Sequence, residues 1–486
     1  MSESDASVPQ VPTAPLLWYT SNTPLQVGQR ECAMARYLGY HAGRHGTGYR
    51  QRAKSVPLVT GGGVHTGLEL LGKWVLDWQG VHVGQVVTLE QMVPAIAWAA
   101  TTAAEQYRAH ATQRGIGLGL SETESPEAVT LLIAEQATLI EALVWVYAIH
   151  RLEYMVARYT LLEVEAEEAP VLGCTCGLGD WVGASEQHAA RGCTGIVMMG
   201  RADFLWQSRE DGSVVYEEFK SKSSANWQWE QAWEHAPQLF INMQAATERL
   251  GAGREVNAAF VPVLYKGNRK RPWGSDAATT PKTQDSPLVY GYYDAGDLPM
   301  RAADWQSAFE TYDELGFKRR LGKTYQKVPI WDAQYPLPEV RPGASRVETW
   351  VRSHITPVQL AKITQVLGPF PRPVARVALA VSGVLAEENR WRYDVFTLRQ
   401  HGAFEPGDPA VDSNIPRSWN CTTYGGRCQF YGVCTREPGW EDLSTHPNFQ
   451  IRTPHHETER AAWERAGVVF PPGDFEGDGD EGEGGA

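Results

Sequence analysis

The period of the hydrophobic pattern changes near residue 159, and this change limits which folds the chain can adopt. From about 89 to 159 apolar residues recur at helical spacing, with a break at about 115–126. Short alternating or apolar runs bounded by turn residues then indicate strands at 159–168, 198–207 and 214–220. A helical pattern over 227–250 and a strand over 258–265 follow. This order predicts an α/β core with helices packed against a mixed sheet.

Further helices are expected on either side of this core. Thr23 is placed to cap a helix over 25–40, and the glycine-rich turn at 61–63 is expected to open a second helix. Residues 266–300 are rich in Gly, Pro, Asp and Thr, which predicts a loop. Mainly helical patterns return at 301–322 and at 345–398, where Pro371 and Pro373 interrupt them.

The expected organisation has six parts. They are a flexible arm (1–22), an N-terminal helical region (23–160), the core (161–265), a loop and helical region (266–415), a cysteine loop (416–440) and a disordered acidic tail (471–486).

Two acids and a lysine form the strongest chemical pattern. Asp203 lies on the second strand of the core, and Glu218 and Lys220 lie on the third, after the turn-forming Asp211-Gly212. Side chains alternate along a strand, so Glu218 and Lys220 share one side. A hairpin at the turn brings Asp203 to that side. Such a group suits Mg²⁺ or Mn²⁺ and the hydrolysis of a phosphodiester. Taken alone, Glu-x-Lys is more often a solvated strand face.

The neighbouring motifs give the pattern its context. Gly62-Gly63-Val64-His65-Thr66-Gly67-Leu68-Glu69 precedes the core, and Gln238 lies on the helix that follows the third strand. Together these segments resemble the RecB-like branch of the PD-(D/E)xK nuclease superfamily, which includes AddB-type, CRISPR-associated and phage exonucleases. The resemblance covers roughly residues 25–80, 155–265 and 415–436. Asn242 stands where that branch usually has a tyrosine, four residues after Gln238.

The resemblance implies a fold and a set of roles. The fold is an α/β, restriction-endonuclease-like mixed sheet flanked by helices, with large helical insertions and an iron–sulfur staple. The implied metal ligands are His65, Asp203, Glu218 and the backbone carbonyl of Phe219. Lys220 becomes the catalytic lysine, with Gln238 as a further site residue. An accessory acid is expected from the first strand, where Glu163 and Glu165 have the same parity; Glu165 is preferred.

The cysteines fall into two groups. Cys421, Cys428 and Cys434 share one aromatic and glycine-rich loop, and soft thiolates of this kind suit iron–sulfur clusters or zinc. With Cys32 as the fourth ligand, they resemble the staple of the AddB-type nucleases, which implies a [4Fe–4S] cluster; zinc in the same four thiolates is the alternative. Cys174, Cys176 and Cys193, with His188 nearby, either form a small zinc site or bind no metal.

Composition restricts the remaining choices. The net charge of -13 argues weakly against a nucleic-acid surface, although local basic clusters can persist beneath it. Two such clusters are Lys266, Arg269, Lys270 and Arg271, and Lys318, Arg319 and Arg320, which equally suit a solvated face. The sequence has no apolar run of about 18 residues and no secretory signal, so we expect a cytoplasmic protein, in the host cytoplasm if it is phage-encoded.

The resulting hypothesis is a metal-dependent DNA exonuclease acting in recombination, end processing or phage DNA metabolism. Its expected partners are DNA and a recombination or replication protein, while the oligomeric state is not indicated. Two alternatives stay open: a non-catalytic DNA-binding or scaffold protein with a nuclease fold, and an enzyme that acts on RNA.

Overall fold

The structure is a computed structural model. It describes residues 17–21, 24, 32–51, 56–114, 126–174, 195–222, 227–251, 253–266, 292–294, 327–329, 346–353, 360, 363–402, 405, 407–417, 428–438, 440, 442–454 and 456–470. No helix in these ranges is long and apolar enough to cross a membrane.

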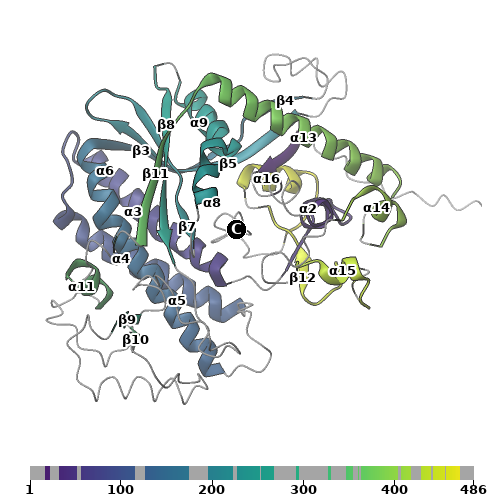
Figure 1. Ribbon diagram of the computed structural model, residues 1–486, viewed down its shortest axis with the longest axis horizontal. Coiled ribbons are helices and arrows are strands. Elements are labelled where there is room, and N and C mark those ends of the chain that lie inside the picture. Colours follow the sequence, from purple (N-terminus) through teal and green to yellow (C-terminus); the bar gives the residue numbers. More distant parts are fainter. Residues whose placement is uncertain are drawn as a thin grey trace, which may run out of the picture.

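A mixed sheet of eight strands forms the centre of the described chain (Figure 1). Its main path runs β1-β5-β6-β8-β11, and β3 and β4 pair with β5 while β7 pairs with β8. The strands are β1 (Leu17–Ser21), β3 (Tyr159–Glu168), β4 (Val171–Cys174), β5 (Gly195–Ser208), β6 (Val214–Glu217), β7 (Lys220–Lys222), β8 (Val256–Tyr265) and β11 (Thr364–Pro371). The pairs β1–β5, β6–β8 and β7–β8 are parallel and the others antiparallel.

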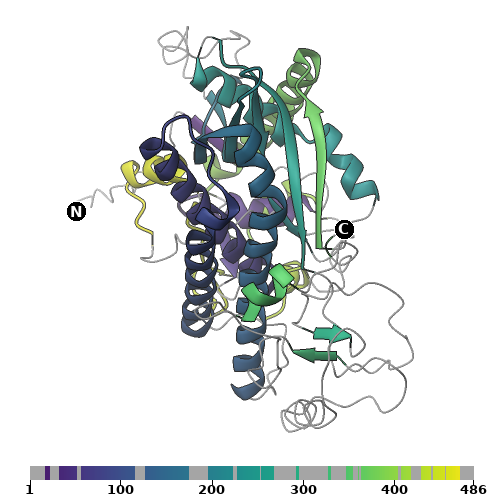
Figure 2. The same cartoon turned by 90° about the vertical axis from the view of Figure 1, so that its left-hand side faces the viewer.

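Helices cover both faces of this sheet (Figures 1 and 2). One face carries α3 (Val56–Val81), α4 (Leu89–Arg114), α5 (Pro126–Tyr147), a π-helical turn (Ala148–Leu152), α6 (Glu153–Arg158) and α11 (Arg346–Ser353). The other face carries α8 (Trp227–Ala232), a 3₁₀ turn (Trp233–His235), α9 (Pro237–Leu250) and the first half of α13 (Val374–Gln400). The protein is therefore an α/β protein with a mixed sheet flanked by helices, as the sequence predicts.

The alternation of side chains along β5 explains why both faces are covered. Phe204 and Trp206 are buried against α3–α5, whereas Leu205 between them is buried in the cluster that contains α9. Successive strand residues point to opposite faces, so a strand that is apolar on both faces needs a helical layer on each side.

A second, smaller apolar cluster lies beside the second half of α13. It contains residues of α2 (Ala33–Tyr40), α14 (Pro409–Asn414), α15 (Tyr431–Thr435), β2 (Tyr49–Gln51) and β12 (Phe449–Ile451). β2 and β12 form a small antiparallel pair, and α16 (Glu457–Arg465) follows β12. Trp391, Val395 and Leu398 of α13 belong to this cluster, so the helix joins it to the sheet. A separate antiparallel pair joins β9 (Tyr292–Asp294) and β10 (Lys327–Pro329).

Several expected boundaries need correction. The expected arm (1–22) is wrong at its end, because Leu17–Ser21 form β1 and pair with β5. Glycines 61–63 do not open a helix but lie inside α3, which begins at Val56. They are small because the helix packs closely: a Cβ at Gly63 would lie 2.5 Å from Ile140, and one at Gly61 would lie 2.9 Å from Ser221.

The expected helix over 227–250 is broken where Pro237 starts α9. The sequence predicts that residues 345–398 are mainly helical, but they contain the strand β11. Its Gly368, Pro369 and Pro371 disfavour a strand, so the sequence does not indicate one. β11 tolerates its prolines because, within the described part of the chain, it is an edge strand that pairs only with β8, and it is irregular at Leu367/Phe370. Residues 25–31, 115–125, 267–291, 301–326 and 471–486, on which other expectations fall, lie outside the described residues.

Candidate metal centre

The hairpin between β5 and β6 places the first two acids side by side. Gly212 adopts a φ of +73° in the turn, and Asp211 Oδ1 accepts hydrogen bonds from Ser213 N at 3.0 Å and Ser213 Oγ at 2.7 Å. The register pairs Phe204 with Glu217, so Asp203 lies opposite the segment that begins at Glu218. The backbone N–H of Phe219 donates to the Asp203 carboxylate. The hairpin expected at Asp211-Gly212 is confirmed.

Helix α3 brings the imidazole to these acids. His65 Nδ1 lies 3.5 Å from Asp203 Oδ1, and the His65 ring makes an edge contact with the Phe219 ring. Gly67 lets α3 pack closely on α5, because a Cβ at this position would lie 2.5 Å from Val144. The glycines of the His65 motif therefore serve close packing of α3.

Glu165 completes a group of three. Ligand atoms of His65, Glu165 and Asp203 all lie within 4.8 Å of one another, and among the described residues this is the group found with metal-ligand geometry. Glu163 instead forms an ion pair with Arg249 of α9. Glu163 and Glu165 do not share one side of β3, as regular alternation would require. The reason is that Glu165 has a φ of +50° and that the β3–β5 register shifts between Leu161 and Glu163. The preference for Glu165 over Glu163 therefore agrees with the geometry.

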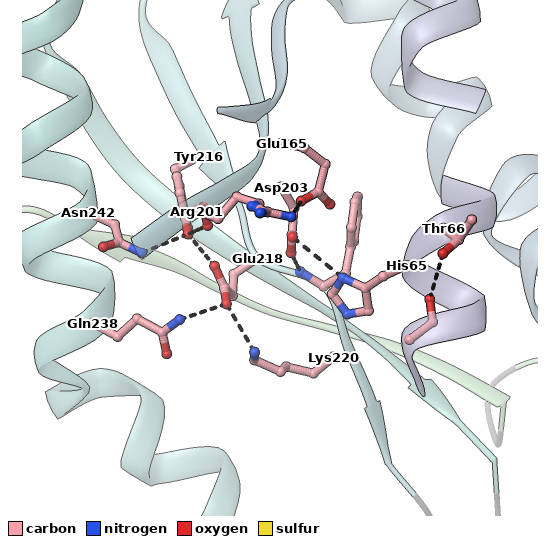
Figure 3. Close-up of polar contacts among 12 residues, drawn as sticks. His65, Thr66, Glu165, Arg201, Asp203, Tyr216, Glu218, Lys220, Gln238 and Asn242 are labelled. Atoms are coloured by element: carbon pink, nitrogen blue, oxygen red, sulfur yellow. Dashed lines mark hydrogen bonds and ion pairs between the residues drawn. The ribbon is translucent and has the colours of Figure 1, made fainter. Parts of the chain in front are cut away.

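Glu218 and Lys220 lie next to this group and on one side (Figure 3), although the expected strand 214–220 is interrupted at Glu218 and Phe219, between β6 and β7. Lys220 Nζ is 3.0 Å from Glu218 Oε1, to which Gln238 Nε2 also donates at 3.0 Å. Glu218 is thus turned toward the lysine and α9, and it is not a member of the three-residue group. All three side chains are buried, with residue exposures of 8% or less.

Two further residues, which the sequence analysis did not assign to the site, hold the Glu218 side chain in place. Tyr216 OH donates to the Glu218 carboxylate, and Asn242 Nδ2 donates to Tyr216 OH at 3.3 Å. Asn242, the departure from the usual tyrosine, lies against Gly200, where a Cβ would be 2.2 Å from its Oδ1. Strand parity alone could have found Tyr216, because it lies two residues before Glu218 on the same strand face.

The charges of the group are unbalanced. Burial lowers the pKa of His65, but the Asp203 and Glu165 carboxylates outweigh burial and raise that pKa to about 9. Burial, with repulsion from Asp203, raises the pKa of Glu165 to about 8, against the opposing effects of His65 and Arg201. Arg201 Nη1 lies 3.5 Å from Glu165 Oε2. Crowded acids of this kind attract a cation or a proton.

Glu217, the neighbour of Glu218, is a compensated charge. It is fully buried and accepts hydrogen bonds from Arg151 Nε at 2.7 Å, Trp206 Nε1 at 2.8 Å and Tyr147 OH at 3.2 Å. Arg151 comes from the π-helical turn after α5. This anchor holds the end of β6 against α5 and the π-helical turn, and nothing in the sequence distinguishes it from Glu218.

The cysteines are only partly described. Cys32 lies at the N-cap of α2, Cys428 lies in the turn before α15, and Cys434 lies within α15; all three pack against the second apolar cluster. Their sulfur atoms do not form a group with metal-ligand spacing among the described residues, and Cys421 lies outside them. Cys174 ends β4, while Cys176, His188 and Cys193 also lie outside the described part of the chain.

Comparisons with known proteins give no further assignment. No protein-family model matches the chain, and no curated protein matches it significantly.

Proposed function

We propose that the chain is a Mg²⁺- or Mn²⁺-dependent deoxyribonuclease of the PD-(D/E)xK type, acting as an exonuclease. One observation carries this proposal: His65, Glu165 and Asp203 come from α3, β3 and β5 and meet within metal-ligand distance beside the Glu218–Lys220 pair. The three residues come from one helix and two strands that are separate in the sequence. Burying their charged groups together costs free energy unless a ligand compensates them, so the cluster supports a function.

The donor set fits a hard divalent cation. Two carboxylates and one imidazole are present, with no thiolate, and oxygen-rich sets suit Mg²⁺ and Mn²⁺. A bound cation would neutralise charge on the scissile phosphate and acidify water. Glu218 joins the set if it turns from Lys220, and the N–H of Phe219 on Asp203 places the Phe219 backbone next to the group.

Lys220 has the position that hydrolysis of a phosphodiester requires. Its ammonium group is held by Glu218 and buried, so it presents a fixed positive charge beside the centre. A fixed charge stabilises negative charge that develops on the phosphate oxygens, without reorganisation. Gln238 keeps Glu218 oriented, and Tyr216 restrains its second oxygen.

Aromatic side chains beside the centre favour a nucleic acid as substrate. Lys220 Nζ lies 5.7 Å from the centre of the Trp233 ring, and Lys222 Nζ lies 4.2 Å from that of Trp229. Trp227, at the start of the same helix α8, is 64% exposed. Trp233 is buried and Trp229 is half-buried, so their contacts hold Lys220 and Lys222 beside the centre, whereas the exposed Trp227 presents a ring on which a base can stack.

The iron–sulfur assignment stays part of the proposal. Cys32, Cys428 and Cys434 would hold a [4Fe–4S] cluster with Cys421, and three of these four residues pack against one apolar cluster. Protein purified without oxygen is expected to absorb near ~400 nm. Colourless protein with stoichiometric zinc would overturn this assignment and leave the nuclease proposal intact.

The test is digestion of end-labelled single- and double-stranded DNA, and of RNA, with Mg²⁺, Mn²⁺ or chelator. We expect metal-dependent release of nucleotides from DNA ends, lost in Lys220→Ala. Glu163→Gln is the matched control, because Glu163 lies on the same strand as Glu165 but pairs with Arg249. Protein that cuts no form of DNA would favour the scaffold alternative.

A further inference from the structure

A cavity outside the metal centre lies between β1, the end of α2, the end of α13 and α16. It encloses about 80 Å³, within about 670 Å³ of empty space that includes open solvent. Four aromatic side chains and three charged ones line it: Trp18, Tyr19, Tyr40, Trp463, Arg399, Arg452 and Glu459. None of the proposed nuclease residues touches it, so an inference about this cavity does not depend on the proposed function.

Arg399 is the unusual member of this lining. Within the described residues no carboxylate lies at ion-pair distance from its guanidinium, whereas Arg452 Nη2 lies 2.8 Å from Glu459 Oε1. The Arg399 guanidinium is pressed against the backbone of Gly46, where a Cβ would lie 1.3 Å from Nη2. Burial lowers the pKa of Arg399. A partly buried cation without a counter-ion is costly, and an anion from solution would remove that cost.

His41 adds a second uncompensated group. It is only 8% exposed, and its Nε2 is buried without a hydrogen-bond partner in the described structure. Its ring stacks on Trp18 with ring centres 4.8 Å apart, and Trp18 Nε1 donates to Glu388 at 2.7 Å. Burial and the guanidiniums of Arg36, Arg452 and Arg399 together lower the pKa of His41 well below 6.5. Stacking and the hydrogen bond to Glu388 thus hold this wall in place, and guanidiniums surround His41 beside the cavity.

We propose that this cavity binds a nucleoside 5′-phosphate. The phosphate pairs with Arg399, because a guanidinium forms strong charge-assisted hydrogen bonds with phosphate oxygens. The base lies against the aromatic walls, where planar rings stack favourably. A free mononucleotide and the 5′-phosphorylated end of a strand present the same chemistry.

The test is calorimetric titration of the full-length protein with EDTA present, so that no metal-dependent cleavage occurs. The probes are dAMP, deoxyadenosine, inorganic phosphate, and one short DNA strand with and without a 5′-phosphate. We expect dAMP or the phosphorylated strand to bind, and deoxyadenosine and phosphate to bind at least about tenfold more weakly. Binding of dAMP identifies a free nucleotide as a ligand; binding of the phosphorylated strand alone identifies a strand end.

Two substitutions locate the binding. Arg399→Met should weaken the binding of dAMP or of the strand by about tenfold or more, the loss expected for one charge-assisted pair. Arg390→Met is the matched control, because it removes the same charge from an exposed position of α13 and should change nothing. Trp463→Leu should also weaken binding, with exposed Trp98 replaced by leucine as its control.

Three results would overturn the proposal. They are no binding of either phosphorylated probe, inorganic phosphate that binds as tightly as the phosphorylated probe that does bind, and unchanged affinity in Arg399→Met. If Arg399→Met does not fold, as judged by thermal unfolding, the selectivity of the wild-type protein among the probes and the Trp463→Leu result still decide the question.

Discussion

Two buried histidines experience opposite surroundings, and the contrast separates two regions of the molecule. His65 lies among carboxylates on the sheet, which raise its pKa to about 9 although burial opposes this. His41 lies at the end of α2, where burial and three guanidiniums lower its pKa well below 6.5. The acids of the metal centre therefore favour positive charge beside them, as a proton or a cation, whereas the cavity is lined by an uncompensated guanidinium. The first should attract a cation, and the second an anion.

Compensated charges occur next to both regions and show what a purely structural ion pair looks like. Glu217 is paired with Arg151 on the sheet, and Glu388 is paired with Arg36 beside the cavity, with Arg36 Nη2 2.6 Å from Glu388 Oε1. Both carboxylates are fully buried and hydrogen-bonded by several donors. A buried charge that has a partner of opposite sign is thus explained by the stability of the fold. A buried charge without such a partner indicates a ligand.

The largest expected effect is on cleavage at the metal centre. Asp203→Ala removes the carboxylate that contacts both His65 and the Phe219 backbone, and it should lower DNA cleavage by about 10³-fold or more. Initial rates with Mn²⁺ and Mg²⁺ measure this, with circular dichroism as the check on folding. A folded variant with unchanged rates would remove Asp203 from the active site.

Breaking a compensated pair should reduce stability in either region. Glu217→Ala leaves Arg151 buried without its acid, and Glu388→Ala does the same to Arg36. Each is expected to lower the free energy of unfolding by about 3–5 kcal/mol. Denaturant titration measures both variants. A loss below about 1 kcal/mol in both would show that these pairs are not the structural anchors described above.

A smaller effect on activity should separate the two acids of β3. Glu165→Gln removes a member of the metal group and should lower cleavage by about 10–100-fold. Glu163→Gln breaks only a half-exposed ion pair with Arg249, so cleavage should stay within about twofold. The opposite order of effects would move the accessory acid to Glu163.

The smallest expected effect is on the pH dependence of stability, and it comes from His41 beside the cavity. His41 is neutral in the folded protein, while in the unfolded chain it gains a proton below its ordinary pKa of 6.5. The unfolded state then binds more protons, so stability falls as pH drops below 6.5, by up to about 1.4 kcal/mol per pH unit. His41→Phe keeps the stacked ring and should remove this part of the acid sensitivity. Thermal unfolding between pH 7 and pH 5 compares the two proteins, and identical slopes would contradict the assignment.

Much of the sheet region could be predicted from the sequence because strand alternation and turn chemistry are local. The strand 159–168 was placed with its observed bounds, and the Asp211-Gly212 turn fixed how Asp203 meets the third strand. Alternation also placed Glu218 and Lys220 together. The site depends on His65 as well, and its position came from a family resemblance and not from local rules.

The remainder depends on long-range packing that no local pattern encodes. β11 pairs with β8 from more than 90 residues away, and its prolines are acceptable only at a sheet edge. The positive φ of Glu165 breaks the alternation on which the parity argument rested. The cavity joins β1 to α13 and α16, so the unpaired state of Arg399 becomes visible only once these segments are placed together.

The most direct measurement is calorimetric titration of metal-free protein with Mn²⁺, comparing the wild type with Asp203→Asn and Glu163→Gln. The account predicts Mn²⁺ binding in the wild-type protein and in Glu163→Gln, and its loss in Asp203→Asn, with the same result when His65 is replaced by alanine. Wild-type protein that binds no Mn²⁺, or an Asp203→Asn variant that binds it as tightly as the wild type, would contradict a metal centre at His65, Glu165 and Asp203.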